Sequence, residues 1–247
     1  MRILISGLGG HMGAQVARLC AEGCRGAEAV AGVDFIGWER CSLPCAPDFD
    51  RAETDVDCVV DFSHHSATAA LLDFGKKHSI PLVIATTGQT DEERAAIEEA
   101  AKEIPIFFAA NFSVGVALLI ELAKKAAAAM PDAEIEIVEK HHDRKVDAPS
   151  GTALAIARAL QTVRPNAEIV TGRSGFGKRT KEEIGVHAIR MGNIPGEHEV
   201  LIGTNNQTIS LKHETHDRAV FAEGALAAAA FLQGKPAGLY DMQDLLA

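Results

Sequence analysis

The first 112 residues alternate short apolar runs with amphipathic stretches. Apolar runs at residues 2–6 and 29–33 flank a glycine-rich turn and a helical stretch, which is the β-α-β pattern. Further strands are predicted at 58–62, 82–86 and 106–109, and helices at 67–78 and 91–102. Thr90 and Glu93 form a capping-box signature before the second of these helices. The pattern predicts an α/β fold of the Rossmann type, a doubly wound parallel sheet with helices on both faces.

The pattern changes after Asn111. An alanine-rich apolar helix is predicted at 114–130, followed by strict alternation of polar and apolar positions at 134–137. Alternating runs recur at 187–191, 198–203 and 208–213, which indicates a sheet with one solvated face. We therefore expect an α+β second domain with a mixed or antiparallel sheet. A last apolar helix is predicted at 219–232, and its pattern does not say where it packs.

Composition narrows the classes of function. The chain has 247 residues, 47% of them hydrophobic, and a formal charge of −10, which disfavours nucleic acid and anionic membranes as partners. No apolar run is long enough to span a bilayer, and the first residues reach a strand and a glycine turn too soon for a signal peptide. We expect a cytoplasmic protein.

The five cysteines are clustered in the first quarter of the chain, at Cys20, Cys24, Cys41, Cys45 and Cys58. Their odd number does not suggest a disulfide framework and fits a reducing compartment. The four-residue spacings leave a zinc site conceivable, but no ordered set of four ligands follows. We predict no metal site.

The turn after the first strand is a candidate dinucleotide site. Gly7, Gly10 and Gly13 allow a tight turn and close approach of a pyrophosphate to the backbone at a helix N-terminus. Glycines also serve simply as turn residues, so the turn alone is weak evidence. Asp34 ends the second strand, where a carboxylate can accept from ribose hydroxyls, although a solvated strand-end Asp is the alternative. Because Phe35 follows it rather than a cation, NADH is favoured over NADPH, with Arg40 as the one nearby exception.

The densest chemistry lies between Glu139 and Thr152. Pro149 favours a loop over the residues before it, and Ser150 to Thr152 open a helix predicted at 153–160. A helix start with hydroxyls and N–H groups suits a carboxylate or phosphate, although a plain Ser or Thr N-cap is the simpler reading.

Three basic side chains beside this helix start change the balance. His141 and His142 are of the residue type that can act as acid or base near neutral pH, and Lys145 is a fixed cation. A reductase acting on an anionic C=C or C=N substrate needs such a set, because a proton must follow the hydride and the carboxylates need cationic partners. Paired histidines also bind metals, but no further ligands accompany them. Asp147 either orients Lys145 or only ends the loop.

These residues resemble the 4-hydroxy-tetrahydrodipicolinate reductase (dihydrodipicolinate reductase) family. Its motif E-x-H-H-x-x-K-x-D-A-P-S-G-T-A is complete from Glu139 to Ala153. The resemblance extends to the glycine turn, Asp61 to Ser63, Thr86 to Gly88, Ala110 to Val116, Arg190 with Gly192, Gly196 to His198, and the C-terminal residues 240–246. It covers nearly the whole chain.

The resemblance implies NADH- or NADPH-dependent reduction of a cyclic dicarboxylate to tetrahydrodipicolinate in diaminopimelate and lysine biosynthesis. It implies that His141 is the catalytic acid/base and Lys145 the proton donor, and that substrate carboxylates are held by His142, Ser150, Gly151 and Thr152. It implies that the dinucleotide is lined by Gly7, Leu8, Gly9, Gly10, His11, Met12, Asp34, Ala85, Thr86, Thr87, Ala110, Asn111, Phe112 and Ser113.

The resemblance also implies the domain organisation. Residues 1–112 with 218–247 would form the dinucleotide-binding domain, and residues 113–217 the substrate-binding domain, through whose sheet a homotetramer assembles. Two departures concern the cofactor: Ala85 replaces a common Gly, and Phe35 replaces an Arg that favours NADPH in some members.

Two rival functions share part of this evidence. Another two-domain dehydrogenase acting on an amino-acid-derived carbonyl would need the first domain but not the His-His-Lys and Ser-Gly-Thr set. A non-catalytic dinucleotide sensor would need the glycines and Asp34 but would tolerate loss of His141 and Lys145. The complete motif disfavours both.

Overall fold

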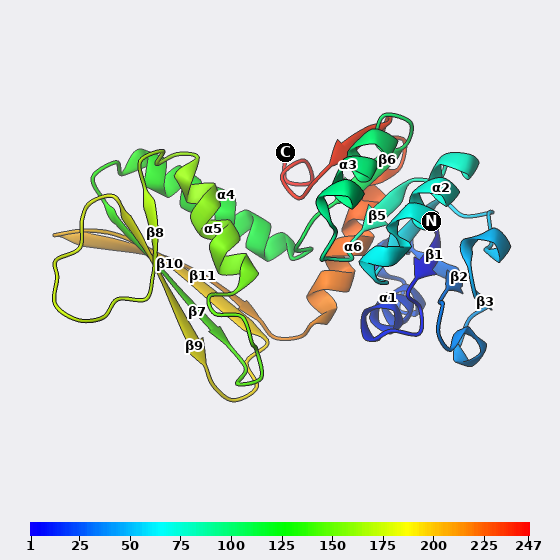
Figure 1. Ribbon diagram of the computed structural model, residues 1–247, viewed down its shortest axis with the longest axis horizontal. Coiled ribbons are helices and arrows are strands. Elements are labelled where there is room, and N and C mark those ends of the chain that lie inside the picture. The colour runs from blue at the N-terminus through cyan, green and yellow to red at the C-terminus, as the bar shows by residue number, and fades with distance from the viewer. The chain divides into compact units, whose positions relative to one another are not determined.

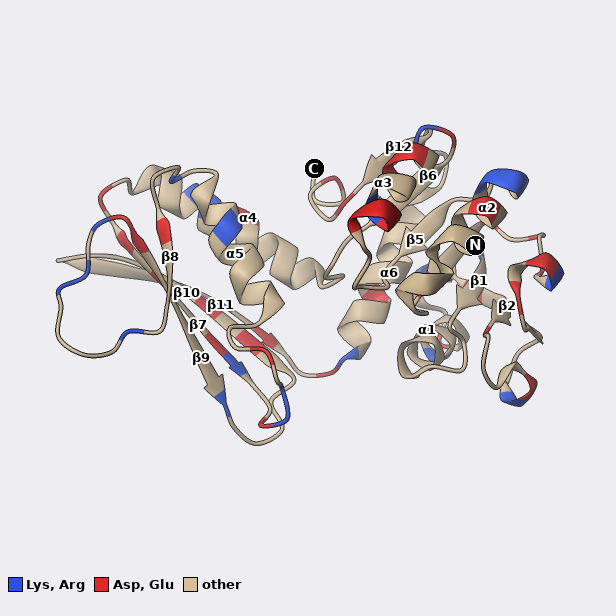
Figure 2. Ribbon diagram, viewed as in Figure 1, with Lys and Arg blue, Asp and Glu red and all other residues tan.

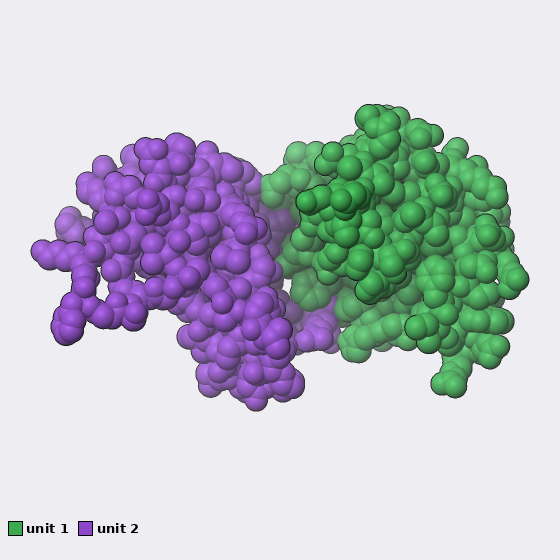
Figure 3. All heavy atoms as spheres, in the orientation of Figure 1, with its two compact units in different colours: residues 1–113, 219–247 green, residues 114–218 purple.

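The computed structural model describes residues 1–247, which divide into two compact units. Unit 1 comprises Met1–Ser113 and Ala219–Ala247, and unit 2 comprises Val114–Arg218 (Figure 3). No helix of the chain has both the length and the apolar character that a membrane crossing requires.

Unit 1 is built on a seven-stranded sheet in which every pairing is parallel (Figure 1). The spatial order is β12-β6-β5-β4-β1-β2-β3. The strands are β1 (Arg2–Ser6), β2 (Glu28–Val33), β3 (Cys45–Ala46), β4 (Cys58–Asp61), β5 (Leu82–Ile84), β6 (Pro105–Phe108) and β12 (Gly238–Tyr240). The strand order reverses between β1 and β4, and ligands of open α/β sheets bind at the carboxyl ends beside such a point.

Helices cover both faces of this sheet. They are α1 (His11–Ala21), α2 (Thr68–His78), α3 (Asp91–Ala100) and α6 (Ala219–Leu232), with short 3-10 helices at Cys24–Gly26, Trp38–Arg40, Phe49–Arg51 and His65–Ala67. α2 and α3 share a buried cluster with strand side chains, whereas α1 packs against α6 and Phe231 of α6 meets Phe107 of β6 edge-on. The predicted doubly wound parallel sheet is confirmed, and so is the capping box of Thr90 and Glu93.

The C-terminal segment belongs to unit 1. α6 is apolar except for the exposed Glu223, and most of its residues are buried, as expected for a helix inside a core. It can approach the backbone at Phe112 because residue 224 is glycine: a Cβ there would lie 1.7 Å from the Phe112 carbonyl oxygen. β12 then pairs with β6 and extends the sheet.

Unit 2 is a five-stranded mixed sheet with two helices on one face. Its strands, in the order β11-β10-β7-β9-β8, are β7 (Glu134–His141), β8 (Glu168–Thr171), β9 (Glu183–Arg190), β10 (Gly196–Thr204) and β11 (Gln207–Thr215). β10 runs antiparallel to β7 and β11, and β9 runs parallel to β7 and β8. α4 (Val114–Ala129) and α5 (Gly151–Gln161) cover the face that holds Ile135, Ile137, Val186 and Val200.

Charged residues recur along the strands of the unit 2 sheet (Figure 2), and those that alternate with the buried positions of β7 and β10 lie on the face opposite the helices. Lys140 of β7 pairs with Glu197 of β10 at 2.9 Å, and Glu136 accepts from His187 of β9 at 2.7 Å. This face is the solvated one that the alternation predicts, and we call it the open sheet face.

One prediction about this unit is wrong in an informative way. The residues before Pro149 were expected to form a loop, yet Glu139, Lys140 and His141 are the last residues of β7. The polar–apolar pattern does not reveal these last residues of the strand, because Glu139 and His141 occupy its inward positions, where apolar residues are usual. The short strands β3, β8 and β12 were not predicted either, since they have too few residues to show a period.

Candidate active site

The glycine turn brings β1 directly into α1. Gly7 has φ +80°, and a Cβ on it would lie 2.7 Å from the Phe62 carbonyl oxygen, so the close passage of β1 and β4 ends requires glycine. Gly13 is equally restricted, since its Cβ would lie 2.1 Å from the Gly7 oxygen. α1 begins at His11 with Gly10 as N-cap, and no side chain caps it. An uncapped helix start beside a tight glycine turn fits a pyrophosphate.

Asp34 lies against this turn at the end of β2. Its Oδ2 accepts the Gly9 N–H at 2.8 Å, and its Oδ1 accepts the Ile36 N–H at 2.9 Å. The two bonds orient the carboxylate beside Gly9. The position fits the predicted contact with ribose hydroxyls, so the residues present can hold the adenosine half of a nicotinamide dinucleotide.

The predicted dinucleotide-binding residues after β5 differ in exposure and in their contacts. Thr86 is buried and its hydroxyl donates to Asp61 Oδ2 at 2.6 Å, whereas Ala85 is partly exposed and Thr87 is exposed. Asp61 is also buried and accepts from the Ser63 hydroxyl; burial raises its pKa, and these hydrogen bonds oppose the rise. The Asp61 carboxylate therefore braces two loops at the carboxyl edge of the sheet, a role that the sequence did not reveal.

The segment after β6 has a similar local brace. Asn111 Oδ1 accepts the Ser113 N–H at 2.7 Å, which turns the chain after Ala110. Phe112 is buried, with its ring against Phe62 and Phe107. Phe112 thus anchors the turn through core packing, while its neighbours carry the polar groups.

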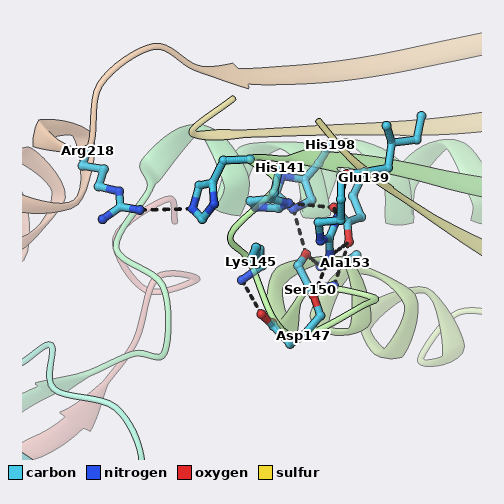
Figure 4. Close-up of polar contacts among 11 residues, drawn as sticks. Glu139, His141, Lys145, Asp147, Ser150, Ala153, His198 and Arg218 are labelled. Carbon is cyan, nitrogen blue, oxygen red and sulfur yellow. Dashed lines mark hydrogen bonds and ion pairs between the residues drawn. The ribbon is translucent and has the colours of Figure 1, made fainter. Parts of the chain in front are cut away.

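In unit 2 the predicted catalytic residues come together at the end of β7 (Figure 4). His141 is largely buried, and its Nδ1 lies 2.7 Å from Glu139 Oε2. Its ring meets that of His198 edge-on, with centroids 5.3 Å apart. Nε2 lies over Gly196, where an added Cβ would be only 3.1 Å away.

Glu139 is fully buried and paired with Arg190 of β9. Burial alone would raise the pKa of this carboxyl, but hydrogen bonds from His141, Arg190 and the Ser150 N–H lower it to about 2. Glu139 is therefore ionised at any working pH.

Lys145 lies on the loop between β7 and α5, with its Nζ 2.8 Å from Asp147 Oδ1. The Lys145 ammonium holds the pKa of Asp147 below its ordinary value, and the Gly151 N–H at the start of α5 contributes in the same direction. The Asp147 carboxylate thus lies between Lys145 and the helix start, where a substrate carboxylate was predicted.

Ser150 is the N-cap of α5, and its hydroxyl accepts the Ala153 N–H at 3.2 Å. The same hydroxyl lies 3.2 Å from His198 Nε2. Gly151 and Thr152 form the first turn, Gly151 exposed and Thr152 partly exposed. The N-cap interpretation is thus confirmed, and the Gly151 N–H at this helix start already interacts with the Asp147 carboxylate.

His142 directly follows β7 and contacts Arg218 rather than the partners of His141. Arg218 NH2 donates to its Nε2 at 3.3 Å. Burial lowers the pKa of the His142 imidazole, and the cations Arg144, Arg218 and Lys145 with His141 lower it further. With its Nε2 accepting from Arg218, a neutral His142 carries its hydrogen on Nδ1, which can donate to a substrate carboxylate.

Sequence reasoning missed four residues of this site. Glu139, Arg190 and His198 stand in the quoted motifs but received no role, and Arg218 was not singled out. Arg190 lies 51 positions from Glu139 and His198 lies 48 positions from Ser150 in the sequence, and only the strand register of β7 with β9 and β10 brings them together. The pairing of His198 with Glu139 in that register could not be read from spacing.

Together, a dinucleotide-type glycine turn in unit 1 and an acid–base and anion-binding set in unit 2 define a two-domain nicotinamide-dependent reductase. Comparison with known proteins makes the class specific. Residues 1–112 match the family model "Dihydrodipicolinate reductase, N-terminus", and residues 115–246 match "Dihydrodipicolinate reductase, C-terminus". The chain belongs to the 4-hydroxy-tetrahydrodipicolinate reductase family, enzymes of diaminopimelate and lysine biosynthesis that use NAD(P)H.

Individual relatives agree over their full lengths. The 4-hydroxy-tetrahydrodipicolinate reductase of Caldanaerobacter subterraneus subsp. tengcongensis is 46% identical, with 100% of this chain and 98% of that protein aligned. That of Clostridium tetani is 42% identical over 100% and 97%. A dipicolinate-bound dihydrodipicolinate reductase from Paenisporosarcina sp. TG-14 superposes with a TM-score of 0.83 at 25% identity, covering 100% of this chain and 99% of that one. The chain is thus similar to enzymes with this activity throughout both units.

Proposed function

We propose that unit 1 is the dinucleotide-binding domain of this reductase and that unit 2 binds and protonates the cyclic dicarboxylate. The observation that carries the proposal is the convergence of His141, Lys145 and the α5 start at one end of the unit 2 sheet. The product is tetrahydrodipicolinate, and the enzyme acts in the cytoplasm, as its clustered unpaired cysteines favour.

The bound dinucleotide supplies the hydride, and unit 2 handles the proton and the substrate charge. Lys145, an ammonium held by Asp147, donates the proton that must accompany the hydride. His141 acts as the acid/base partner through Nε2, since its Nδ1 is engaged by Glu139. These roles need a substrate carboxylate to replace Asp147 beside Lys145.

The carboxylates of the substrate are held by groups with N–H or O–H donors. Gly151 and Thr152 offer the N-terminus of α5, where the helix dipole favours an anion. His142 and Ser150 flank them, and Arg218 adds a cation beside His142. Dipicolinate, the planar dicarboxylate named with the Paenisporosarcina enzyme, is the ligand that we expect at this position.

The dinucleotide lies along the turn formed by Gly7 to Met12 and along the strand-end residues 85–87 and 110–113. NADH is preferred, because the Asp34 carboxylate accepts from ribose hydroxyls and repels a 2′-phosphate. Phe35, half exposed beside it, supplies no compensating cation.

The open sheet face is the surface through which we propose a homotetramer. Its alternating acidic and basic positions include the Lys140–Glu197 and Glu136–His187 pairs, which can match a symmetric copy of themselves. Ile189 and Met191 add exposed apolar area at the edge of this face. Light scattering of the purified protein should give four chains.

A coupled assay tests the function. The preceding synthase makes the substrate in situ from its own precursors, and the loss of NADH absorbance is followed. We expect NADH oxidation that requires both enzymes and stops when dipicolinate is added in excess. No NADH or NADPH oxidation with an active synthase would overturn the proposal.

A further inference from the structure

The Glu139 carboxylate has more partners than an ordinary buried ion pair. Oε1 accepts the Ser150 N–H at 2.9 Å and Arg190 NH2 at 2.7 Å, and Oε2 contacts His141 Nδ1 at 2.7 Å and accepts Arg190 NH1 at 2.8 Å. Each oxygen thus has two neighbours that fill its two lone-pair directions (Figure 4). Two strands, β7 and β9, and the start of α5 meet at this one group.

The chemistry of the carboxylate fixes the state of His141. An ionised carboxylate has no hydrogen to donate, so the ring nitrogen that it contacts must carry one. Arg190 supplies the counter-charge through two parallel hydrogen bonds and keeps the carboxylate in a single orientation. His141 Nδ1 is therefore a permanent donor, and only Nε2 can gain or lose a proton.

The surroundings of Nε2 agree with this division. Glycine at position 196 leaves room over Nε2, and the His198 ring packs edge-on beside it. His198 is buried, and its Nε2 is hydrogen-bonded to the Ser150 hydroxyl. It therefore packs against His141 as a neutral ring and does not compete for a hydrogen bond with His141 Nε2. Burial lowers the pKa of His198 to about 4.

We propose that Glu139 is a positioning residue that holds neutral His141 as the Nδ1–H tautomer, with all proton exchange at Nε2, and that the same carboxylate fixes the start of α5. Arg190 serves this role as the counter-ion, and its NH2 also donates to the Asp147 carbonyl oxygen, which ties the Lys145 loop to the same centre. The inference rests on the role proposed for His141, and it adds that the acid/base group and the anion-binding helix start share one anchor.

The tautomer is measurable in the wild-type protein. Protein labelled with ¹⁵N-histidine is examined by long-range ¹H–¹⁵N NMR, and His141 is assigned by the signal missing in His141→Gln. At alkaline pH we expect a protonated-type Nδ1 and a pyridine-type Nε2. Wild-type His141 with its hydrogen mainly on Nε2 would overturn the proposal.

Glu139→Gln tests whether the Glu139 carboxylate causes this tautomer of His141. Its amide nitrogen has hydrogens to donate, so His141 Nδ1 is free to become the acceptor and the hydrogen to move to Nε2. We expect the NMR pattern to invert or mix, and kcat to fall by about 10²- to 10⁴-fold, as when the orienting carboxylate of a catalytic histidine is replaced by an amide. KM for the substrate should change by less than about 5-fold. An unchanged His141 pattern in a folded variant would contradict the proposal.

Glu136→Gln is the matched control. Glu136 lies on the same strand but on the open sheet face, and its carboxylate likewise contacts a histidine and an arginine, His187 and Arg179. The His141 signals should not change in this variant. Changed signals would mean that the loss of any negative charge on β7 changes the His141 tautomer, which would contradict a specific role of Glu139.

A double-variant cycle separates this inference from the proposed function. If Glu139 acts through His141, adding Glu139→Gln to His141→Gln should lower kcat by less than about 3-fold further. Independent, multiplying losses would refute the positioning role while leaving His141 catalytic. Wild-type turnover in His141→Gln alone would instead refute the proposed function, and the wild-type tautomer would still decide the inference.

Discussion

Asp34 offers the sharpest test of cofactor preference, because one charge can be removed without changing the shape of the side chain. In Asp34→Asn, the amide oxygen can still accept from Gly9 or Ile36, whose N–H groups lie 2.8 and 2.9 Å from the carboxylate. The adenosine 2′-phosphate of NADPH carries a charge near −2. At a separation of about 5 Å, it would be repelled by about 1.7 kcal/mol in bulk water and by about 6.6 kcal/mol at an effective dielectric constant of about 20.

Asp34 is partly exposed, so the lower end of that range applies, and we take about 2 kcal/mol. We therefore expect the ratio of the NADPH to the NADH dissociation constant to fall by roughly 30-fold in Asp34→Asn. Isothermal titration of both dinucleotides at low salt measures it, and added salt should shrink the difference. Glu98→Gln, which removes an exposed charge from α3, is the matched control. An unchanged ratio in Asp34→Asn would refute the electrostatic explanation.

Three further predictions concern unit 2 and the core of unit 1. Asp147→Asn releases Lys145 from its ion pair, so dipicolinate should bind more tightly by up to about 5-fold in calorimetry, and weaker binding would mean that Asp147 organises the site instead. His198 is buried with a pKa of about 4 against an ordinary 6.5, so the unfolded chain takes up the proton first as pH falls, and stability is lost between those values. His198→Gln should remove about 2.5 kcal/mol of the loss in urea-unfolding free energy between pH 7 and 4.5, and an identical pH dependence would contradict this. Gly224→Ala places a Cβ 1.7 Å from the Phe112 carbonyl oxygen, so it should lower the free energy of unfolding by about 1–3 kcal/mol and lower Tm in calorimetry by several degrees. An unchanged Tm would show that α6 can shift away from Phe112 without loss of stability.

The fold of unit 1 was predictable because its strands are short apolar runs between amphipathic helices, and parallel sheets produce that pattern. Unit 2 was predictable in class but not in pairing. The run at 187–191 begins at Glu183 in the structure, and β9 lies parallel to β7, a choice that depends on the crossover through α5 and β8. Local alternation carries no information about strand direction.

The residues of the candidate site could likewise be predicted only where they are close together in the sequence. His141, Lys145 and Ser150 to Thr152 are close in sequence, so spacing alone brings them together. Glu139 was visible as a letter of the motif, but its function depends on Arg190, which lies 51 positions away and reaches it through strand register. Long-range polar networks of this kind leave no local pattern, since each member alone reads as an ordinary charged residue.

The central claim is that His141 and Lys145 handle the proton while unit 1 holds the dinucleotide independently of them. The direct measurement is turnover of His141→Gln and Lys145→Ala in the synthase-coupled assay, together with the NADH dissociation constant of each variant. His78→Gln and Lys178→Ala, changed at other positions on α2 and in the loop before β9, serve as controls. We expect kcat to fall by about 10²-fold or more in both catalytic variants, with the NADH dissociation constant within about 2-fold of wild type. Wild-type turnover in both would contradict the claim.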